Sequence, residues 1–232
     1  DVYKRQLTNK SLDELFEIRY KGSTFYIDHM HKAAEKELKK RYENIFFNCT
    51  QNEDIDFLIF PEMLITEEIM SSLKAHKRSE SRPIVIINGS IWKDKINKTL
   101  ITDDEGMKIL EYAKKEPFKY RYAGKEYTEW LDQSRNKEYT ILEIEGIGRI
   151  GVAICKDLVN EDVKLFHKAM ETDILIVPAY TKSMDLQTSA ENMSEEYHCI
   201  VVVANACSAL RGKVDGEKIG FVSLPAKNGA QR

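Results

Sequence analysis

GRIGVAIC (148–155) is a largely apolar run that ends in a cysteine, and KDLVNEDVKLFHKAM (156–170) follows it directly. The run predicts a buried strand, and the residues after it predict a loop and then a helix. A side chain at the carboxyl end of a buried strand in an α/β sheet faces the crevice where such proteins bind ligands. Cys155 is therefore a candidate nucleophile, although most buried free cysteines only fill space in a core.

Strands and helices alternate on both sides of this segment. Short apolar runs predict buried strands at IDFLIF (55–60), PIVIINGS (83–90), DILIVPA (173–179), IVVVANA (200–206) and GFVSL (220–224). Apolar residues spaced three or four apart predict helices over 23–46, 66–77, from about 162, and around 186–198. Thr66 is a plausible cap for the second helix.

Two pairs of runs predict hairpins inserted among these elements. KTLITD (98–103) and KILEYAKK (108–115) form one pair, and YTILEIE (139–145) and RIGVAIC (149–155) form the other. GIGRIG (146–151) has the spacing of a dinucleotide-binding loop but leads into a strand, so we interpret it as a tight turn. The pattern predicts the α/β class with mixed sheets, and the Val- and Ile-rich runs need cover on both faces, which favours a layered sandwich.

The 232 residues carry no internal repeat or linker, and we predict one domain over 23–225. The opening hexapeptide DVYKRQ (1–6) resembles a translated sequencing adapter, so we expect 1–22 to be a non-native or flexible segment. A native polar N-terminus is the alternative. We expect 226–232 to be a truncated C-terminal end.

Composition excludes several classes of protein. A net charge of −3 argues against a general nucleic-acid binder, because no excess of positive charge is present to neutralise phosphates. No apolar run approaches the ~20 residues of a membrane span, so no membrane partner is predicted. The four cysteines lack paired spacing, which predicts reduced thiols in the cytoplasm. No spacing typical of a metal site occurs, and we expect no metal or organic cofactor.

Three predicted strands end in residues whose chemistry is complementary. Glu62 follows the first strand, Lys114 and Lys115 end the second strand of the first hairpin, and Cys155 ends the run described above. The ends of buried strands in α/β sheets converge on one crevice. A lysine there can lower the pKa of the thiol and hold a developing oxyanion, and a glutamate can take the thiol proton and later activate water.

Five segments, in order along the chain, resemble the carbon–nitrogen hydrolases of the nitrilase superfamily. They are IDFLIFPEM (55–63), IINGSIW…NKTLITDDEG…YAKKEPF (86–118), GRIGVAICKDL (148–158), DILIVPA (173–179) and EYHCIVVVANA (196–206). The resemblance implies an α-β-β-α sandwich with mixed sheets and a Glu–Lys–Cys triad. It also implies a small-molecule amide or nitrile as substrate and a homodimer.

The resemblance places the triad on Glu62 as general base, Lys114 and Cys155. Lys114 matches through the family's Tyr-x-Lys pattern, with Tyr112 in place and Lys115 as the fallback. The backbone N–H of Lys156 would donate to the oxyanion. A second carboxylate that orients the lysine would be Glu126 or Glu129, and the sequence does not choose between them.

The chain departs from the family pattern at Glu116, where an aromatic residue or histidine is common, and at LVNE (158–161). These departures bear on the substrate more than on the triad. The implied activity is hydrolysis of a non-peptide amide or nitrile through a thioester. One alternative is a non-catalytic or regulatory module inside a larger protein, and another is an acyltransferase with the same triad.

Overall fold

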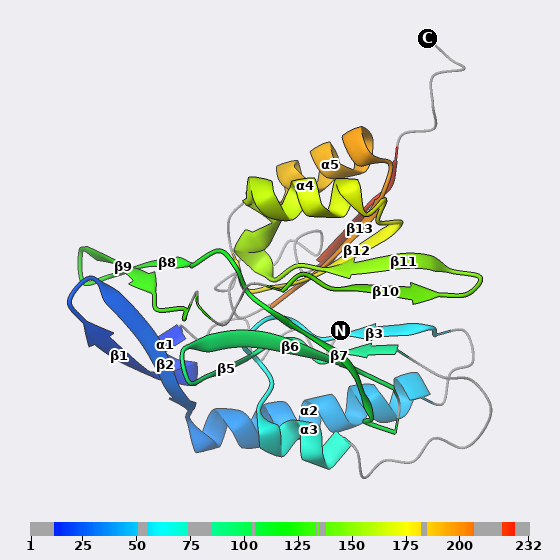
Figure 1. Cartoon of the computed structure of the whole chain (residues 1–232). Helices are drawn as coiled ribbons and strands as arrows, with labels where there is room; N and C mark the ends of the chain where they lie inside the picture. Colours follow the sequence, from blue (N-terminus) through cyan, green and yellow to red (C-terminus); the bar gives the residue numbers. More distant parts are fainter. Residues whose placement is uncertain are drawn as a thin grey trace.

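The computed structural model describes residues 12–50, 55–73, 85–103, 105–132, 134, 138–181, 185–206 and 220–225. Two sheets stack on each other, with a pair of helices over each outer face, so the layers run α-β-β-α (Figure 1). The predicted α/β class and the four-layer sandwich of the nitrilase type are confirmed.

The sheet that we call the β12 sheet has the order β10-β11-β12-β13-β14. Its strands are β10 (Ile141–Ile144), β11 (Gly148–Val152), β12 (Ile174–Ala179), β13 (Ile200–Asn205) and β14 (Gly220–Ser223). The three central strands are parallel, and α4 (Glu161–Ala169) and α5 (Asp185–Tyr197) connect them over the outer face. Parallel strands need such crossovers, and the cover they provide explains the unbroken Val and Ile runs.

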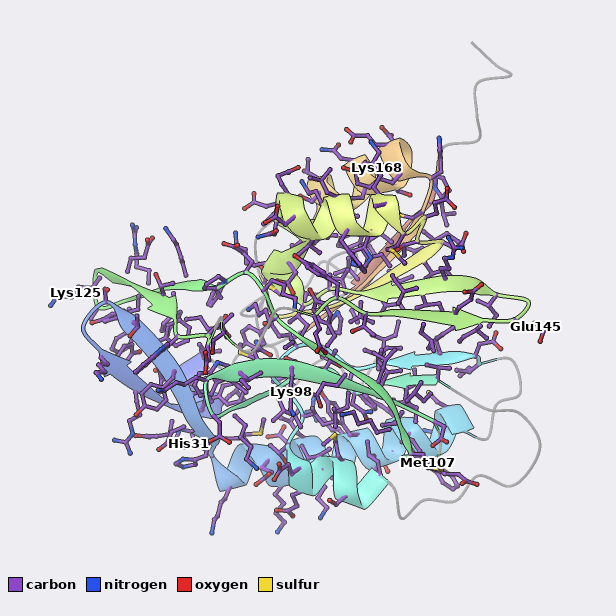
Figure 2. The ribbon with its side chains drawn as sticks, in the orientation of Figure 1. His31, Lys98, Met107, Lys125, Glu145 and Lys168 are labelled. Carbon is purple, nitrogen blue, oxygen red and sulfur yellow. The ribbon has the colours of Figure 1, made fainter. Side chains whose placement is uncertain are left out.

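The β6 sheet has the order β3-β4-β6-β5, with β7 paired to β6. Its strands are β3 (Phe57–Ile59), β4 (Val85–Ile87), β5 (Ile91–Lys93), β6 (Ile96–Thr102) and β7 (Lys108–Ala113). Helices α2 (Lys32–Thr50) and α3 (Glu67–Leu73) cover its outer face (Figure 1). Side chains fill the space between the two stacked sheets (Figure 2), where Ile87 and Ile101 belong to the same buried cluster as Ile150 and Leu175.

A third sheet, the β9 sheet, lies beside the sandwich with the order β1-β2-β9-β8. It contains β1 (Phe16–Lys21), β2 (Thr24–Met30), β8 (Lys119–Tyr122) and β9 (Lys125–Glu129), and the short helix α1 (Leu12–Leu15) precedes it. Lys125 marks the outer tip of the β8–β9 hairpin (Figure 2). The other end of β9 carries Glu129 to the edge of the sandwich.

Two predictions at the start of the chain are wrong. The predicted helix over 23–46 is the strand β2 followed by α2, because Thr24, Phe25, Tyr26 and Ile27 are β-branched or aromatic and alternate between buried and partly exposed positions. The predicted flexible segment 1–22 includes α1 and β1, and Leu15 and Phe16 are buried in the core. The folded unit therefore begins by residue 12, while 1–11 and 226–232 lie outside the described residues.

Both predicted hairpins are confirmed, since β6 pairs with β7 and β10 pairs with β11 in antiparallel register. GIGRIG forms the turn of the second hairpin, with Gly146 and Gly148 at φ of 79° and 116°. Thr66 caps α3 as predicted, because its hydroxyl accepts a hydrogen bond from the Ile69 N–H at 3.3 Å. Among the described residues, no helix has the length and apolar character needed to cross a membrane.

Candidate active site

Glu62 lies in a tightly held loop just after β3. Gly89, which follows β4 with φ of +65°, approaches this loop so closely that a Cβ there would lie 2.2 Å from the Pro61 carbonyl oxygen. The Met63 N–H donates to the Ser90 hydroxyl at 3.0 Å on the other side of Glu62. The connection between β4 and β5 therefore fixes the loop on both sides of Glu62, and the Glu62 side chain is buried.

Lys114 follows β7 directly, and its side chain is fully buried. The Lys114 N–H donates to the Asn97 carbonyl oxygen on β6 at 2.8 Å, which extends the pairing of β6 with β7 by one step. The ammonium donates to Glu62 Oε1 at 2.7 Å and to Glu129 Oε2 at 2.8 Å. A buried ammonium needs such partners, because charges removed from water are costly unless they are paired.

Glu129, rather than Glu126, is the second carboxylate beside the lysine. Glu129 ends β9 with its side chain buried, and it also accepts from the Phe118 N–H at 2.9 Å. Glu126 is exposed and lies 3.4 Å from the surface residue Lys119. The β9 sheet, which the sequence analysis partly assigned to a flexible tail, therefore completes the site.

Cys155 begins the 3₁₀ helix Cys155–Val159 after β11 and adopts the left-handed conformation, with φ of 49°. Few residues other than glycine do so, and such strain concentrates at functional sites. The buried thiol faces the Glu62 carboxylate. The Tyr180 N–H, at the end of β12, donates to Glu62 Oε2 at 3.1 Å and also faces the thiol. The predicted residues Glu62, Lys114 and Cys155 thus meet.

Asn97 is a member of this cluster that the sequence analysis missed. Its fully buried amide donates to Glu62 Oε1 at 2.9 Å and to Glu129 Oε1 at 3.1 Å, so it bridges the two carboxylates that hold Lys114. The reverse orientation of the Asn97 amide would place its oxygen against two carboxylates, and none of these groups could donate a hydrogen bond. The only available signal was its position directly before KTLITD (98–103), the predicted partner of the strand that ends in Lys114 and Lys115.

The electrostatics of the site make Glu62 a stronger base and keep Cys155 protonated at rest. Burial raises the pKa of the Glu62 carboxyl, against the pull of Lys114, and makes it a stronger base. Burial alone would lower the pKa of Lys114, but Glu129 and Glu62 outweigh it and raise that pKa well above its ordinary value. Burial and the Glu62 charge raise the pKa of Cys155 well above its ordinary value, although Lys114 pulls the other way. The lysine lowers the pKa of the thiol as predicted, but burial and Glu62 outweigh it, and the resting group is a thiol.

Lys115, the fallback for the lysine, points elsewhere. Its ammonium donates to the Glu138 carbonyl oxygen and lies 5.0 Å from the centre of the Tyr139 ring.

The two positions that depart from the family pattern contact each other, because the Asn160 side chain of LVNE donates to the Glu116 carboxylate at 2.9 Å. Lys156 follows Cys155 in the same 3₁₀ helix, and its role as an oxyanion donor stays a prediction.

Within the part of the chain that the structure describes, no group of three or more His, Cys, Asp and Glu side chains is arranged to hold a metal ion. The cluster instead combines a thiol, two carboxylates, an ammonium and a bridging amide. Such a set can deprotonate a nucleophile, hold an oxyanion and return the proton to a leaving group.

A family model described as carbon–nitrogen hydrolase matches residues 25–220. The chain belongs to the carbon–nitrogen hydrolase family. The predicted family and its enzyme class are therefore confirmed, and the matched residues lie within the domain predicted over 23–225. No curated protein sequence matches the chain.

Solved structures of this superfamily share the fold. Nit3 of Saccharomyces cerevisiae is 15% identical with a TM-score of 0.59, over 83% of this chain and 78% of Nit3. An amidase from Nesterenkonia sp. is 11% identical with a TM-score of 0.57, over 74% of this chain and 70% of the amidase. The glutamine-dependent NAD+ synthetase of Acinetobacter baumannii is 16% identical with a TM-score of 0.54, over 74% of this chain but only 35% of the synthetase.

Proposed function

We propose that the chain hydrolyses the carbon–nitrogen bond of a small non-peptide amide or nitrile through a thioester on Cys155, with Glu62, Lys114 and Cys155 as its triad. The observation that carries the proposal is the contact of the buried Glu62 carboxylate with both the Cys155 thiol and the Lys114 ammonium. This contact brings together a nucleophile, a base that can activate it and a cation that can stabilise the oxyanion.

In the first half-reaction on an amide, Cys155 Sγ attacks the carbonyl carbon while Glu62 takes the thiol proton. The negative charge moves to the carbonyl oxygen, where the Lys114 ammonium and the Lys156 N–H stabilise it. The C–N bond then breaks, Glu62 gives its proton to the departing nitrogen, and a thioester remains. Glu129 and Asn97 keep Lys114 and Glu62 in place.

In the second half-reaction, Glu62 removes a proton from water as the water oxygen attacks the thioester. The acid leaves, and the proton returns to Cys155 Sγ. Glu62 suits both directions of proton transfer because burial raises its pKa, which brings the base closer to neutral conditions. No metal or organic cofactor enters either half.

Ammonia release from a panel of small amides and nitriles tests the proposal. We expect release with at least one member, and we expect Cys155→Ala to abolish it, whereas Cys199→Ala removes another buried thiol and keeps the activity. In one variant of the Nesterenkonia amidase, the acetamide moiety of fluoroacetamide is attached to the active-site cysteine. Fluoroacetamide therefore serves as a covalent probe, and we expect its adduct on Cys155.

Two other outcomes separate the alternatives. Formation of a hydroxamate with added hydroxylamine, at a rate above that of acid release, would indicate an acyltransferase that passes the acyl group to an amine. A folded chain whose Cys155 reacts with iodoacetamide no faster than Cys199 would indicate a non-catalytic or regulatory module. In the proposed enzyme, labelling of Cys155 persists well below pH ~8, because Glu62 removes the proton during attack.

The chain spans about a third of the NAD+ synthetase it resembles and more than two thirds of the amidase and Nit3. Its place in a free-standing amidase or in a larger protein is therefore part of the proposal, and the neighbouring coding sequence tests it. The homodimer and the cytoplasmic location stay predictions, which sedimentation and fractionation would check.

A further inference from the structure

Asp157 is a buried carboxylate outside the proposed triad, two residues after Cys155. Its four hydrogen-bond donors come from the two segments that carry the lysine and the nucleophile. Oδ1 accepts from the backbone N–H groups of Lys115 at 2.8 Å and Glu116 at 2.6 Å. Oδ2 accepts from the Ile154 N–H at 3.0 Å and from the Tyr112 hydroxyl at 2.9 Å.

Three of these donors belong to residues that are next to, or close to, the two catalytic residues in the sequence. Lys115 and Glu116 directly follow Lys114, and Ile154 directly precedes Cys155. Oδ1 of Asp157 therefore holds the backbone just after β7, and Oδ2 joins the Tyr112 side chain of β7 to the backbone of the turn that carries Cys155. We propose that Asp157 is a positioning residue that clamps these two segments and so sets where the Cys155 thiol lies relative to Glu62 and Lys114; the role rests on the proposed function.

The geometry requires a carboxylate rather than an amide. An asparagine has one oxygen, so it can accept from the end of β7 or from the cysteine turn but not from both. With its oxygen toward Lys115 and Glu116, its NH₂ group would face the Ile154 N–H, and two donors would oppose each other. Substitution by asparagine should therefore release the turn that carries Cys155 while it leaves the end of β7 in place.

The ionisation of Asp157 fits this role. Burial raises its pKa to about 6, against the opposing pull of the three backbone N–H groups and the Lys114 charge. The carboxyl is therefore ionised at neutral pH, and both oxygens are free to accept hydrogen bonds. The Tyr112 hydroxyl keeps its proton, because burial and the Asp157 charge raise its pKa well above the ordinary value.

The test measures the rate constant for alkylation of Cys155 by iodoacetamide in the full chain, from about pH 5 to about pH 9, with mass spectrometry of the Cys155 peptide. We expect Asp157→Asn to lower the rate at neutral pH about tenfold to 100-fold and to give the pH profile of an ordinary thiol. Circular dichroism of each variant confirms folding across this pH range, because an unfolded chain would also give the profile of an ordinary thiol. Asp173→Asn is the matched control, since Asp173 accepts from the Arg149 N–H at 2.7 Å near the opposite end of β11 and should leave the profile unchanged.

An Asp157→Asn variant with the wild-type rate and profile overturns the proposal. If that variant does not fold, Tyr112→Phe carries the test, because it removes one donor to Oδ2 and leaves the three backbone donors. We expect a rate about threefold lower at neutral pH, and an unchanged rate in that variant overturns the clamp. A wild-type chain in which Cys155 reacts no faster than Cys199 instead overturns the proposed function and leaves the clamp without a role.

Discussion

Cys155 and Cys199 are two thiols of one sheet that differ in their neighbours rather than in their burial. Both are 1% exposed and belong to the same apolar cluster. Cys155 follows β11 at the carboxyl ends of the parallel strands, whereas Cys199 precedes β13 at their amino ends. Burial raises the pKa of both thiols, that of Cys199 to about 11.

The polar groups around the two thiols come from different sources. Cys199 Sγ lies 3.7 Å from the Met193 carbonyl oxygen of the neighbouring helix. Cys155 meets Glu62 from the other stacked sheet, and that carboxylate in turn holds Lys114. A thiol that is only buried is inert, so we expect the difference in reactivity between Cys155 and Cys199 to come from the strand ends that converge on Cys155.

Glu62→Gln should produce the largest loss, because it removes the base and turns Cys155 into a thiol resembling Cys199. We expect the rate of amide hydrolysis to fall about 10²- to 10⁴-fold, the usual contribution of a general base. The measurement is the steady-state rate of ammonia release, with circular dichroism to confirm folding. A residual rate within about tenfold of wild type would contradict the assignment of the base.

The pH dependence of wild-type activity should report the same base. The reaction needs the ionised Glu62, so activity is present above the pKa of that group and is lost as the pH falls through it. Burial raises this pKa above its ordinary value, so the acid limb should lie above the pH at which an exposed glutamate titrates. A limb at the position of an ordinary carboxyl would contradict the role of burial.

Lys114→Met should lower the rate about 10²- to 10³-fold, through loss of the charge at the oxyanion. Lys115→Met is the matched control, because the two lysines are adjacent in sequence but only Lys114 contacts both Glu62 and Glu129. We expect Lys115→Met to remain within about threefold of wild type. Similar losses in the two variants would contradict the structural distinction between them.

Glu129→Gln should have a smaller effect on activity, because Lys114 keeps its contact with Glu62. We expect about a tenfold loss, since misplacement of a catalytic group lowers the rate without removing it. Glu126→Gln changes the other candidate carboxylate of the same strand, which is exposed beside Lys119. Its rate should equal that of wild type in the same assay, and a loss as large as that of Glu129→Gln would reopen the choice.

The sequence predicted the parts of the site that depend on strand ends. Cys155, Glu62 and Lys114 each follow a run whose apolar pattern marks a buried strand, and such ends converge. Glu129 was left open against Glu126 because the choice depends on the register of β9. That register depends on the pairing of β9 with β2 and β8, and β2 lies in the segment for which the sequence predicts a helix.

Other features depended on contacts between segments distant in sequence. The bridge from Asn97 to two carboxylates joins residues 35 and 32 positions away in the chain. The net pKa of Cys155 depends on burial and on Glu62, whereas the sequence analysis weighed only the lysine. Cys199 is buried, and Cys207 lies outside the described residues.

The smallest expected effect concerns backbone strain at the two cysteines. Cys155 adopts φ of 49°, which costs an alanine about 1–2 kcal/mol and a glycine nothing. Glycine loses about 0.5–1 kcal/mol relative to alanine through its greater freedom in the unfolded chain. Cys155→Gly should therefore be about 0.5–1 kcal/mol more stable than Cys155→Ala.

At Cys199 the order of stability should reverse. Cys199 is not among the described residues with positive φ, so the strain that favours glycine at position 155 is missing and the entropic cost remains. Cys199→Gly should be about 0.5–1 kcal/mol less stable than Cys199→Ala. Urea unfolding of the four variants measures both differences. If the stability difference between the glycine and alanine variants has the same sign at both positions, the backbone at Cys155 stores no strain. The contrast between the two thiols would then rest on their polar neighbours alone.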